Sequence, residues 1–335
     1  MTRSLRTRHA VTLSLLMLVL LIAVAVGLNL GSNRMSWSQI AAAFLGRGYS
    51  VDNLVIFDLR LPRIVMSILV GAGLAVSGVV LQGITRNDLA SPGTVGVSGG
   101  AGLGMMLMLL VSPTIAATMP MLLPLGAVVG ALLTTTLVFA LSYRHGIVLP
   151  SRLLLVGIAI GFGAHAAMLF FSLRMSFVTY SNVVSWMAGT LGSADWKSIR
   201  ILTPCCAVLV PAAWSRARVL NMFLLGDQVA TNLGVSVHRE RLLLLGVATT
   251  LTSACVALGG HMGFLGLVAP HLARRLIGSN HVLLFPAAAL CGAILLLVAD
   301  SLGRHLFAPV DMPAGVLVGI LGGIYFLYLL SRARN

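Results

Sequence analysis

The sequence predicts an all-α protein, a polytopic membrane helical bundle with about ten transmembrane helices. Hydrophobic residues make up 58% of the 335 residues and charged residues only 9%, whereas a soluble domain carries about 25% charged residues. Apolar runs of spanning length recur between short polar loops. Because a bilayer offers no water to the backbone, these runs must form helices or a closed barrel.

The predicted spans follow one another along a single transmembrane permease domain, residues 1–335, with halves of roughly 1–172 and 200–335. Their limits are 11–30, 62–84, 93–111, 121–141, 152–172, 200–214, 242–259, 262–276, 282–303 and 313–330. The first could be mistaken for a signal peptide. Its apolar run from Val11 to Leu28 is too long for that, and no small-residue cleavage site follows.

The two halves share a pattern that predicts inverted repeats. In each half a long span precedes a short, glycine-rich one: 62–84 before 93–111, and 242–259 before 262–276. The two pairs start on opposite sides of the predicted membrane. Inverted repeats with interrupted helices at matching positions are typical of transporters.

Basic residues set the predicted orientation. An even number of spans places both termini on one side, and a cytoplasmic placement puts fourteen of the 22 basic residues in cytoplasmic segments. We therefore expect both termini inside. The outer loops are still unusually basic. A nucleic-acid partner does not explain the net charge of +14, because these residues are scattered between apolar runs rather than clustered.

The stretch SPGTVGVSGGAGLG, residues 91–104, contains G-x-S-x-G at 96–100. The hydrolase elbow of that form needs an α/β sheet, and a phosphate loop needs a lysine after the glycines. An intramembrane serine protease would need Ser98 with His165 or His261 as base. The predicted topology places Ser98 near the cytoplasmic side and His261 near the outer side, a membrane thickness apart. No Walker A motif occurs.

Close helix packing explains this stretch better. Gly96, Gly100 and Gly104 follow small-x-x-x-small spacing, which lets backbones approach. The four cysteines, all inside apolar runs, are interpreted as small packing residues: Cys205, Cys206, Cys255 and Cys291. Asp300 is an intramembrane acid and thus a functional candidate, but pairing with Arg304 one turn later is the favoured interpretation.

The segment LGDQVATNLGV, residues 225–235, predicts a short cytoplasmic helix. Asp227 suits its N-cap and Gly234 its termination. Val229, Ala230 and Leu233 would then share one apolar side. Such a side suits insertion into a groove of a partner protein, or else contact with the membrane surface.

Six ordered motifs carry a resemblance over nearly the whole chain: LRLPR at 59–63, GAGLAVSGVVLQGITRNDLASPGTVGVSGGAG at 71–102, SRLLLVG at 151–157, LGDQVATNLGV at 225–235, GFLGLVAPHLAR at 263–274, and LLVADSLGR with MPAGVLVGILGGIYFLYLL at 296–304 and 312–330. The chain resembles permease subunits of ABC importers for iron-siderophores, haem and cobalamin, the type II, FecCD-like class. The class implies ten helices and a dimer around a central pathway, formed with a second permease copy or a paralogous permease.

The resemblance also implies partners. ABC ATPase subunits would bind ATP and Mg, so this chain itself would need no cofactor and perform no enzymatic step. A periplasmic or lipid-anchored substrate-binding protein would deliver a ferric siderophore across the cytoplasmic (inner) membrane of a bacterium. Haem or cobalamin is the alternative cargo, and a proton-coupled secondary transporter is a distant alternative function, since Asp300 is the one candidate relay.

Residue roles implied by the resemblance fall into three groups. The coupling segment that enters the ATPase comprises Gly226, Asp227, Val229, Ala230, Leu233, Gly234 and Val235. Outward-facing arginines that dock the binding protein are Arg60, Arg63 and Arg304. The cytoplasmic gate comprises Asn87, Asp88, Leu89, Pro150 and Ser151. Many relatives have Asn-Pro-Leu-Ala where this chain has Asn-Asp-Leu-Ala at 87–90, so the rigidity of that turn needs another source.

Overall fold

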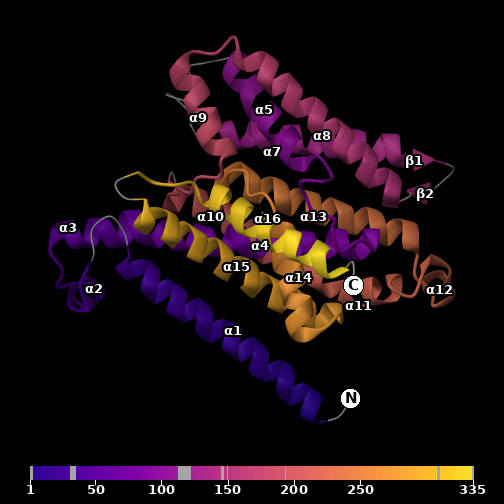
Figure 1. The fold of residues 1–335 in the computed structure, drawn as a ribbon, viewed down its shortest axis with the longest axis horizontal. Helices are drawn as coiled ribbons and strands as arrows, with labels where there is room; N and C mark the ends of the chain where they lie inside the picture. Colours follow the sequence, from indigo (N-terminus) through magenta and orange to yellow (C-terminus); the bar gives the residue numbers. More distant parts are fainter. Residues whose placement is uncertain are drawn as a thin grey trace.

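The computed structural model describes residues 3–30, 35–111, 122–144, 147–148, 150–192, 194–307 and 310–333 (Figure 1). The helices are α1 (Arg3–Asn29), α2 (Trp37–Phe44), α3 (Ser50–Asn53), the π-helix η1 (Leu54–Arg60), α4 (Leu61–Thr85), α5 (Val97–Val111), α7 (Leu123–Ser142), α8 (Pro150–Ser172), α9 (Phe177–Met187), α10 (Trp196–Ser215), α11 (Ala217–Phe223), α12 (Asp227–Asn232), α13 (Val237–Gly259), α14 (Leu265–Ile277), α15 (His281–Leu306) and α16 (Ala314–Ala333). Two short strands, β1 (Tyr143–Arg144) and β2 (Ile147–Val148), pair antiparallel.

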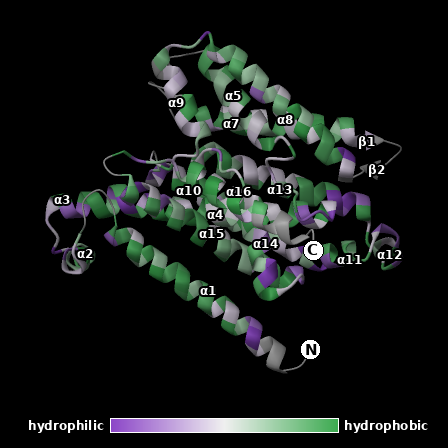
Figure 2. Cartoon of the chain, viewed as in Figure 1, coloured by the Kyte–Doolittle hydropathy of each residue, from purple (hydrophilic) through white to green (hydrophobic). Residues whose placement is uncertain are grey.

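The predicted spans correspond to helices, and the all-α class is confirmed. Among the described residues, seven helices are long and apolar enough to cross a membrane, and α5 and α16 add shorter apolar segments. The hydropathy colouring shows apolar residues along these helices and hydrophilic residues gathered at the two ends of the bundle (Figure 2). The predicted start of the fourth span, residue 121, lies outside the described residues.

Helix α4 forms the centre of the larger layer. It is buried along most of its length and packs against α13, α14 and α15. Glycines permit this approach. A Cβ added at Gly71 would lie 2.9 Å from the Cα of Ala293 in α15, and one at Gly78 would lie 3.0 Å from the Cα of Gly266 in α14. Helix α4, from the first half of the chain, is therefore the central helix around which α13, α14 and α15 of the second half pack.

Helices α5, α7, α8 and α9 form a second layer against α13 (Figure 1). Gly100 and Gly104 face α7, where added Cβ atoms would lie 2.6 Å from the carbonyl oxygen of Gly130 and 2.8 Å from its Cα. Gly96, with φ of 79°, lies just before α5, and its Cβ would lie 3.0 Å from the carbonyl oxygen of Gly157 in α8. Small residues thus set the helix spacing in this layer, as the sequence predicts.

Several helix boundaries differ from the predicted ones, and two of the differences have a clear structural cause. The second span begins earlier, because α3, η1 and α4 continue without a break from Ser50 to Thr85. The third begins later, at Val97, because residues 91–96 form turns. The amide of Thr94 donates to the Ser91 hydroxyl at 3.3 Å, and the amide of Ser91 donates to the Thr94 hydroxyl at 3.0 Å. The strand pair β1–β2 was not predicted.

The bundle has two ends along its long axis. Helix α12 and the β1–β2 pair lie at one end, here called the α12 end, and α2 and α3 lie at the other, here called the Arg63 end (Figure 1). The start of α1 and the end of α16 both point toward the α12 end, which fits the predicted placement of both termini on one side.

Candidate functional site

The predicted short helix is present as α12, and backbone hydrogen bonds define its end. Gly234 adopts φ of 85°, its amide donates to the carbonyl of Thr231 at 2.9 Å, and the amide of Val235 donates to the carbonyl of Ala230 at 3.0 Å. This is a Schellman termination, as expected for a glycine after a helix. Gly226, with φ of 108°, precedes the helix and permits the sharp entry. The two glycines thus fix where α12 starts and stops.

The N-cap prediction is wrong in detail. Gly226 is the N-cap residue, and Asp227 is the first residue of α12. The Asp227 side chain makes no capping hydrogen bond. Its carboxylate instead accepts from Arg86, which ends α4, and from Arg241 of α13 at 3.2 Å. One carboxylate therefore connects α12 to two transmembrane helices.

The exposed apolar face of α12 also differs from the expected one. Val229 and Leu233 are exposed, at 43% and 58%, whereas Ala230 is fully buried. Leu225, at 62% exposure, lies just before the sharp turn at Gly226 and adds a third exposed apolar side chain. Val229 and Leu233 are four residues apart and lie on one side of α12. We call these three residues the α12 apolar row, and a row of this kind suits a groove in a partner.

Arg241 anchors the base of α12. Its side chain is buried, and its guanidinium lies 5.7 Å from the ring centroid of Phe223 in α11. A cation over an aromatic face at this distance is attracted by the ring. Nearby, Arg216 donates to Glu240 at 3.0 Å. These contacts hold α11, α12 and the start of α13 as one unit.

The predicted gate turn, residues 87–89, is held by side chains rather than by proline. The amide of Leu89 donates to the Asn87 side-chain oxygen at 2.9 Å, an Asx turn. The Asp88 carboxylate pairs with Arg274 of α14, which also donates to Gln82 of α4 at 3.0 Å. Asp88 therefore ties this turn to α14.

The remaining gate residues begin another helix. Pro150 is the first residue of α8, and Ser151 after it is exposed. Leu89 is exposed as well, at 44%. The structure shows these positions at the ends of α4 and α8, and their role as a gate stays a prediction.

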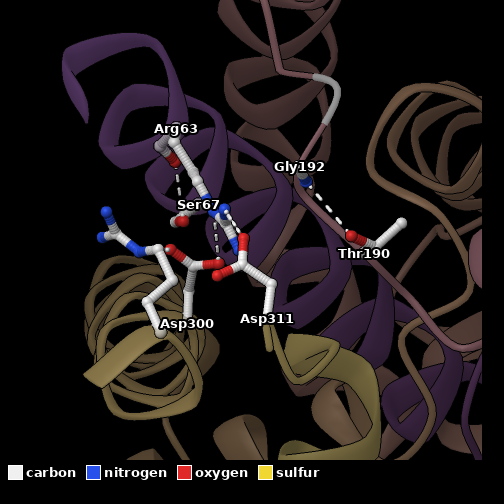
Figure 3. Close-up of polar contacts among 7 residues, drawn as sticks. Arg63, Ser67, Thr190, Gly192, Asp300 and Asp311 are labelled. Carbon is white, nitrogen blue, oxygen red and sulfur yellow. Dashed lines mark hydrogen bonds and ion pairs between the residues drawn. The ribbon is translucent and has the colours of Figure 1, made fainter. Parts of the chain in front are cut away.

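At the Arg63 end, four charged side chains form a cluster (Figure 3). Arg63 donates to Asp300 at 2.8 Å and to Asp311 at 2.9 Å, and Arg304 lies 3.2 Å from the second oxygen of Asp300. The predicted pairing of Asp300 with Arg304 is confirmed, and Arg63 is a second partner. Two positive and two negative groups balance, which is what a buried charge needs. We call these four residues the outer cluster.

The three arginines predicted to face outward are buried. Arg60, Arg63 and Arg304 are 4%, 8% and 7% exposed. Arg60 donates to the carbonyls of Leu28 and Asn29, the last carbonyls of α1, which lack partners within the helix. An outward-facing orientation is therefore wrong in this chain, since internal carboxylates and carbonyls already hold these groups.

A cavity of about 30 Å³ lies where two helix interruptions meet, and its lining includes Ser91 and Ser98 from one side and His261 and Gly263 from the other. The interruption between α13 and α14 contains Gly260 and Phe264, with φ of 78° and 62°. Ser98 and His261 line one cavity, so the predicted separation by a membrane thickness is wrong. No hydrogen bond among the described residues joins them, and His165 bonds its own helix, at the carbonyl of Gly161.

Comparison with known proteins identifies the family. The sequence model of the FecCD transport family matches residues 17–332. The chain belongs to the FecCD transport family. It is 40% identical to the iron(3+)-hydroxamate import system permease protein FhuG of Bacillus subtilis (strain 168) over 92% of both chains, and 38% identical to the ferric enterobactin transport system permease protein FepG of Escherichia coli (strain K12) over 97% of both.

Other FecCD relatives extend the range of cargoes. The chain is 40% identical to the hemin transport system permease protein HmuU of Yersinia pestis, over 92% of this chain and 93% of that one. A solved structure described as an inward-facing metal-chelate-type ABC transporter superimposes with a TM-score of 0.84 at 30% identity, over 96% of this chain and 98% of that one. As a FecCD member, the chain is a transport permease of the ABC importer type.

Sequence reasoning missed several contacts of the FecCD permease. Asp311 in the outer cluster and Arg86 beside Asp227 were not singled out. The Arg63–Asp300 pair joins residues 237 positions apart, and no local pattern predicts it. The sequence prediction named Val229 and Leu233 on the apolar side of this helix, but it included the buried Ala230 and omitted the exposed Leu225.

Proposed function

We propose that this chain is the permease subunit of an ABC importer that carries ferric siderophores across the cytoplasmic membrane, with α12 as the helix that couples it to ATPase subunits. The observation that supports coupling most is the α12 apolar row, exposed on a helix whose base is tied to α4 and α13 by Asp227. An exposed apolar row at a membrane-protein end is a typical partner-binding surface.

Ferric siderophore is the favoured cargo because of the names of the relatives. Permeases for iron(3+)-hydroxamate, ferric enterobactin and Fe(3+) dicitrate align with this chain at 38–40% identity. Organic chelates of this size need a site of about 300–1,000 Å³, far larger than the 30 Å³ cavity of the helix interruptions. We therefore place the pathway between two permease copies, or a copy and a paralogue.

The mechanism follows from the contacts at the α12 end, which we assign to the cytoplasmic side. ATP binding and hydrolysis in the partner subunits move α12. Asp227 transmits this movement to α4 through Arg86 and to α13 through Arg241. Because Gln82 and Asp88 hold Arg274 of α14, the 87–89 turn moves with α4 and α14, and the predicted gate opens or closes.

Binding-protein docking is assigned to the Arg63 end. Since Arg60, Arg63 and Arg304 are buried, we propose that they hold the helix ends beneath the docking surface. The direct contacts to acidic lobes of the binding protein then come from exposed basic residues around them. Arg47, Lys197 and Arg200 are exposed there, and Trp196 places the start of α10 beside η1 through a 2.8 Å hydrogen bond to the carbonyl of Phe57.

The test of docking compares the two basic sets. Reversal of Arg47, Lys197 and Arg200 to glutamate is expected to abolish binding-protein capture by the purified permease–ATPase complex, with unchanged melting temperature. Reversal of the buried Arg63 to glutamate is instead expected to lower the melting temperature of the complex. Unchanged capture by the first variant would contradict the assignment to exposed residues.

The test of the function is transport. Vesicles reconstituted with the permease, its ATPase and its binding protein are expected to accumulate ⁵⁵Fe-siderophore only when ATP is supplied on the α12 side. Haem is the second candidate cargo, because the hemin permease HmuU is as similar as the hydroxamate permease. If excess haem prevents the uptake of ⁵⁵Fe-siderophore, haem is the favoured cargo. If the vesicles accumulate neither compound, the importer proposal is contradicted.

A further inference from the structure

A groove of about 210 Å³ opens between the two layers near the α12 end. Helix α7 contributes Leu132, Thr136 and Phe139, α8 contributes Leu153, and α13 contributes Leu242 and Gly246. The lining is largely apolar. A Cβ added at Gly246 would meet no atom within 4 Å, so this glycine leaves the groove open.

The surface beside the groove is apolar too. On α7, Leu133, Leu137 and Leu141 are 65%, 50% and 54% exposed. All three lie in a helix that is long and apolar enough to cross a membrane. An apolar band on a helix of this length suits contact with lipid hydrocarbon, and the groove beside it is then within reach of acyl chains.

Two arginines stand close in sequence to groove-lining residues, at the starts of α8 and α13. Arg239 is exposed and lies one helical turn before Leu242, on the same side of α13. Arg152 adjoins Leu153 in the first turn of α8. No ion pair among the described residues includes Arg152 or Arg239, and the nearby carboxylate of Glu240 is held by Arg216 at 3.0 Å. Both arginines therefore bring positive charge close to groove-lining residues, with no ion pair to another described side chain.

We propose that this groove binds an anionic phospholipid, with one acyl chain between α7 and α13 and the phosphate at Arg152 and Arg239. Lipid tails are as apolar as leucine, so the groove alone discriminates little between lipids. Selectivity comes from the headgroup charge, as in basic pockets between transmembrane helices. Because α13 follows α12 directly, the lipid braces the helix that carries the coupling segment. Lipid binding at this groove is independent of which cargo the permease carries.

Native mass spectrometry of the full-length permease tests the site, with phosphatidylglycerol and phosphatidylcholine as probes. We expect the wild type to retain phosphatidylglycerol and to lose phosphatidylcholine. The double variant Arg152→Gln/Arg239→Gln is expected to bind phosphatidylglycerol about 25-fold more weakly, from roughly a fivefold loss for each charge.

A second variant tests the groove itself. Gly246→Leu fills it with little backbone strain and is expected to displace the lipid. The matched control is Gly319→Leu in α16, where an added Cβ likewise meets no atom within 4 Å, and lipid retention is expected to stay at the wild-type level.

Three results would overturn the proposal. Equal retention of the two lipids by the wild type would remove the charge selectivity. Full retention by Gly246→Leu would place the lipid elsewhere. A disulfide crosslink between two copies that each carry Thr136→Cys, with the native cysteines blocked, would show that a second copy covers the groove.

Discussion

Arginine and aspartate meet at both ends of α4, but in opposite surroundings. In the outer cluster, Asp300 is fully buried and its partners Arg63 and Arg304 are nearly so. At the α12 end, Asp227 and Arg86 have side chains that are 46% and 36% exposed. The same pairing of residue types thus serves a rigid joint at one end and a solvent-accessible link at the other.

The difference in burial decides what each cluster contributes. Loss of one partner from a buried pair costs about 3–5 kcal/mol, because an uncompensated charge stays inside. An exposed pair contributes about 0–1 kcal/mol. The outer cluster therefore stabilises the fold, whereas the Asp227 link can break and re-form while α12 moves, at little cost.

The largest expected effect is at Asp300. Asp300→Ala should lower the free energy of unfolding by about 3–5 kcal/mol, since Arg63 and Arg304 lose their shared buried partner. Thermal melting of the purified permease in detergent measures it. Asp311→Asn is the matched control within the cluster, because the Asp311 side chain is 55% exposed, and it should cost less than about 1 kcal/mol. If the two variants lower the free energy of unfolding equally, burial does not decide how much each charge contributes to stability.

An intermediate effect is expected at Arg241, which belongs to the α12 end but is itself buried. Arg241→Ala removes the pair with Asp227 and the contact with Phe223. The expected loss of stability is about 1–2 kcal/mol, measured in the same melting assay. A loss as large as that of Asp300→Ala would show that the two ends do not differ in rigidity.

The smallest effect on stability is expected at Asp227. Asp227→Ala should lower the free energy of unfolding by less than about 1 kcal/mol. Its ATP-driven uptake should nonetheless fall at least tenfold, because α12 is no longer tied to α4 and α13. Uptake per ATP hydrolysed is the measurement, and normal uptake with normal coupling would remove Asp227 from the mechanism.

The features that sequence reasoning predicted are local ones. The α12 helix was predicted from Asp227 at its start, Gly234 at its end and the apolar residues between them, because helix ends depend on neighbours in the chain. The glycine contacts of α5 follow from a four-residue spacing, although the partner, Gly130 of α7, does not. The spans follow from apolar length alone.

The features that it missed depend on distant residues. Arg63 is buried because it pairs with Asp300, 237 positions away in the chain. Without knowledge of that partner, an arginine near a helix end is predicted to be exposed. Ser98 and His261 line one cavity because two helix interruptions converge there, which a count of spans cannot show. The residues around Asp227 predict an N-cap, whereas its actual partners are Arg86 at the end of α4 and Arg241 of α13.

The central claim is that the α12 apolar row binds the ATPase. Its most direct test is replacement of Leu225, Val229 and Leu233 by serine, with Leu133→Ser/Leu137→Ser/Leu141→Ser on α7 as a matched exposed control. Co-purification of the ATPase with each permease variant is the measurement. The account predicts that the α12 variant loses at least nine-tenths of the bound ATPase, while its melting temperature and the ATPase binding of the control stay unchanged. Wild-type ATPase binding by the folded α12 variant would contradict it.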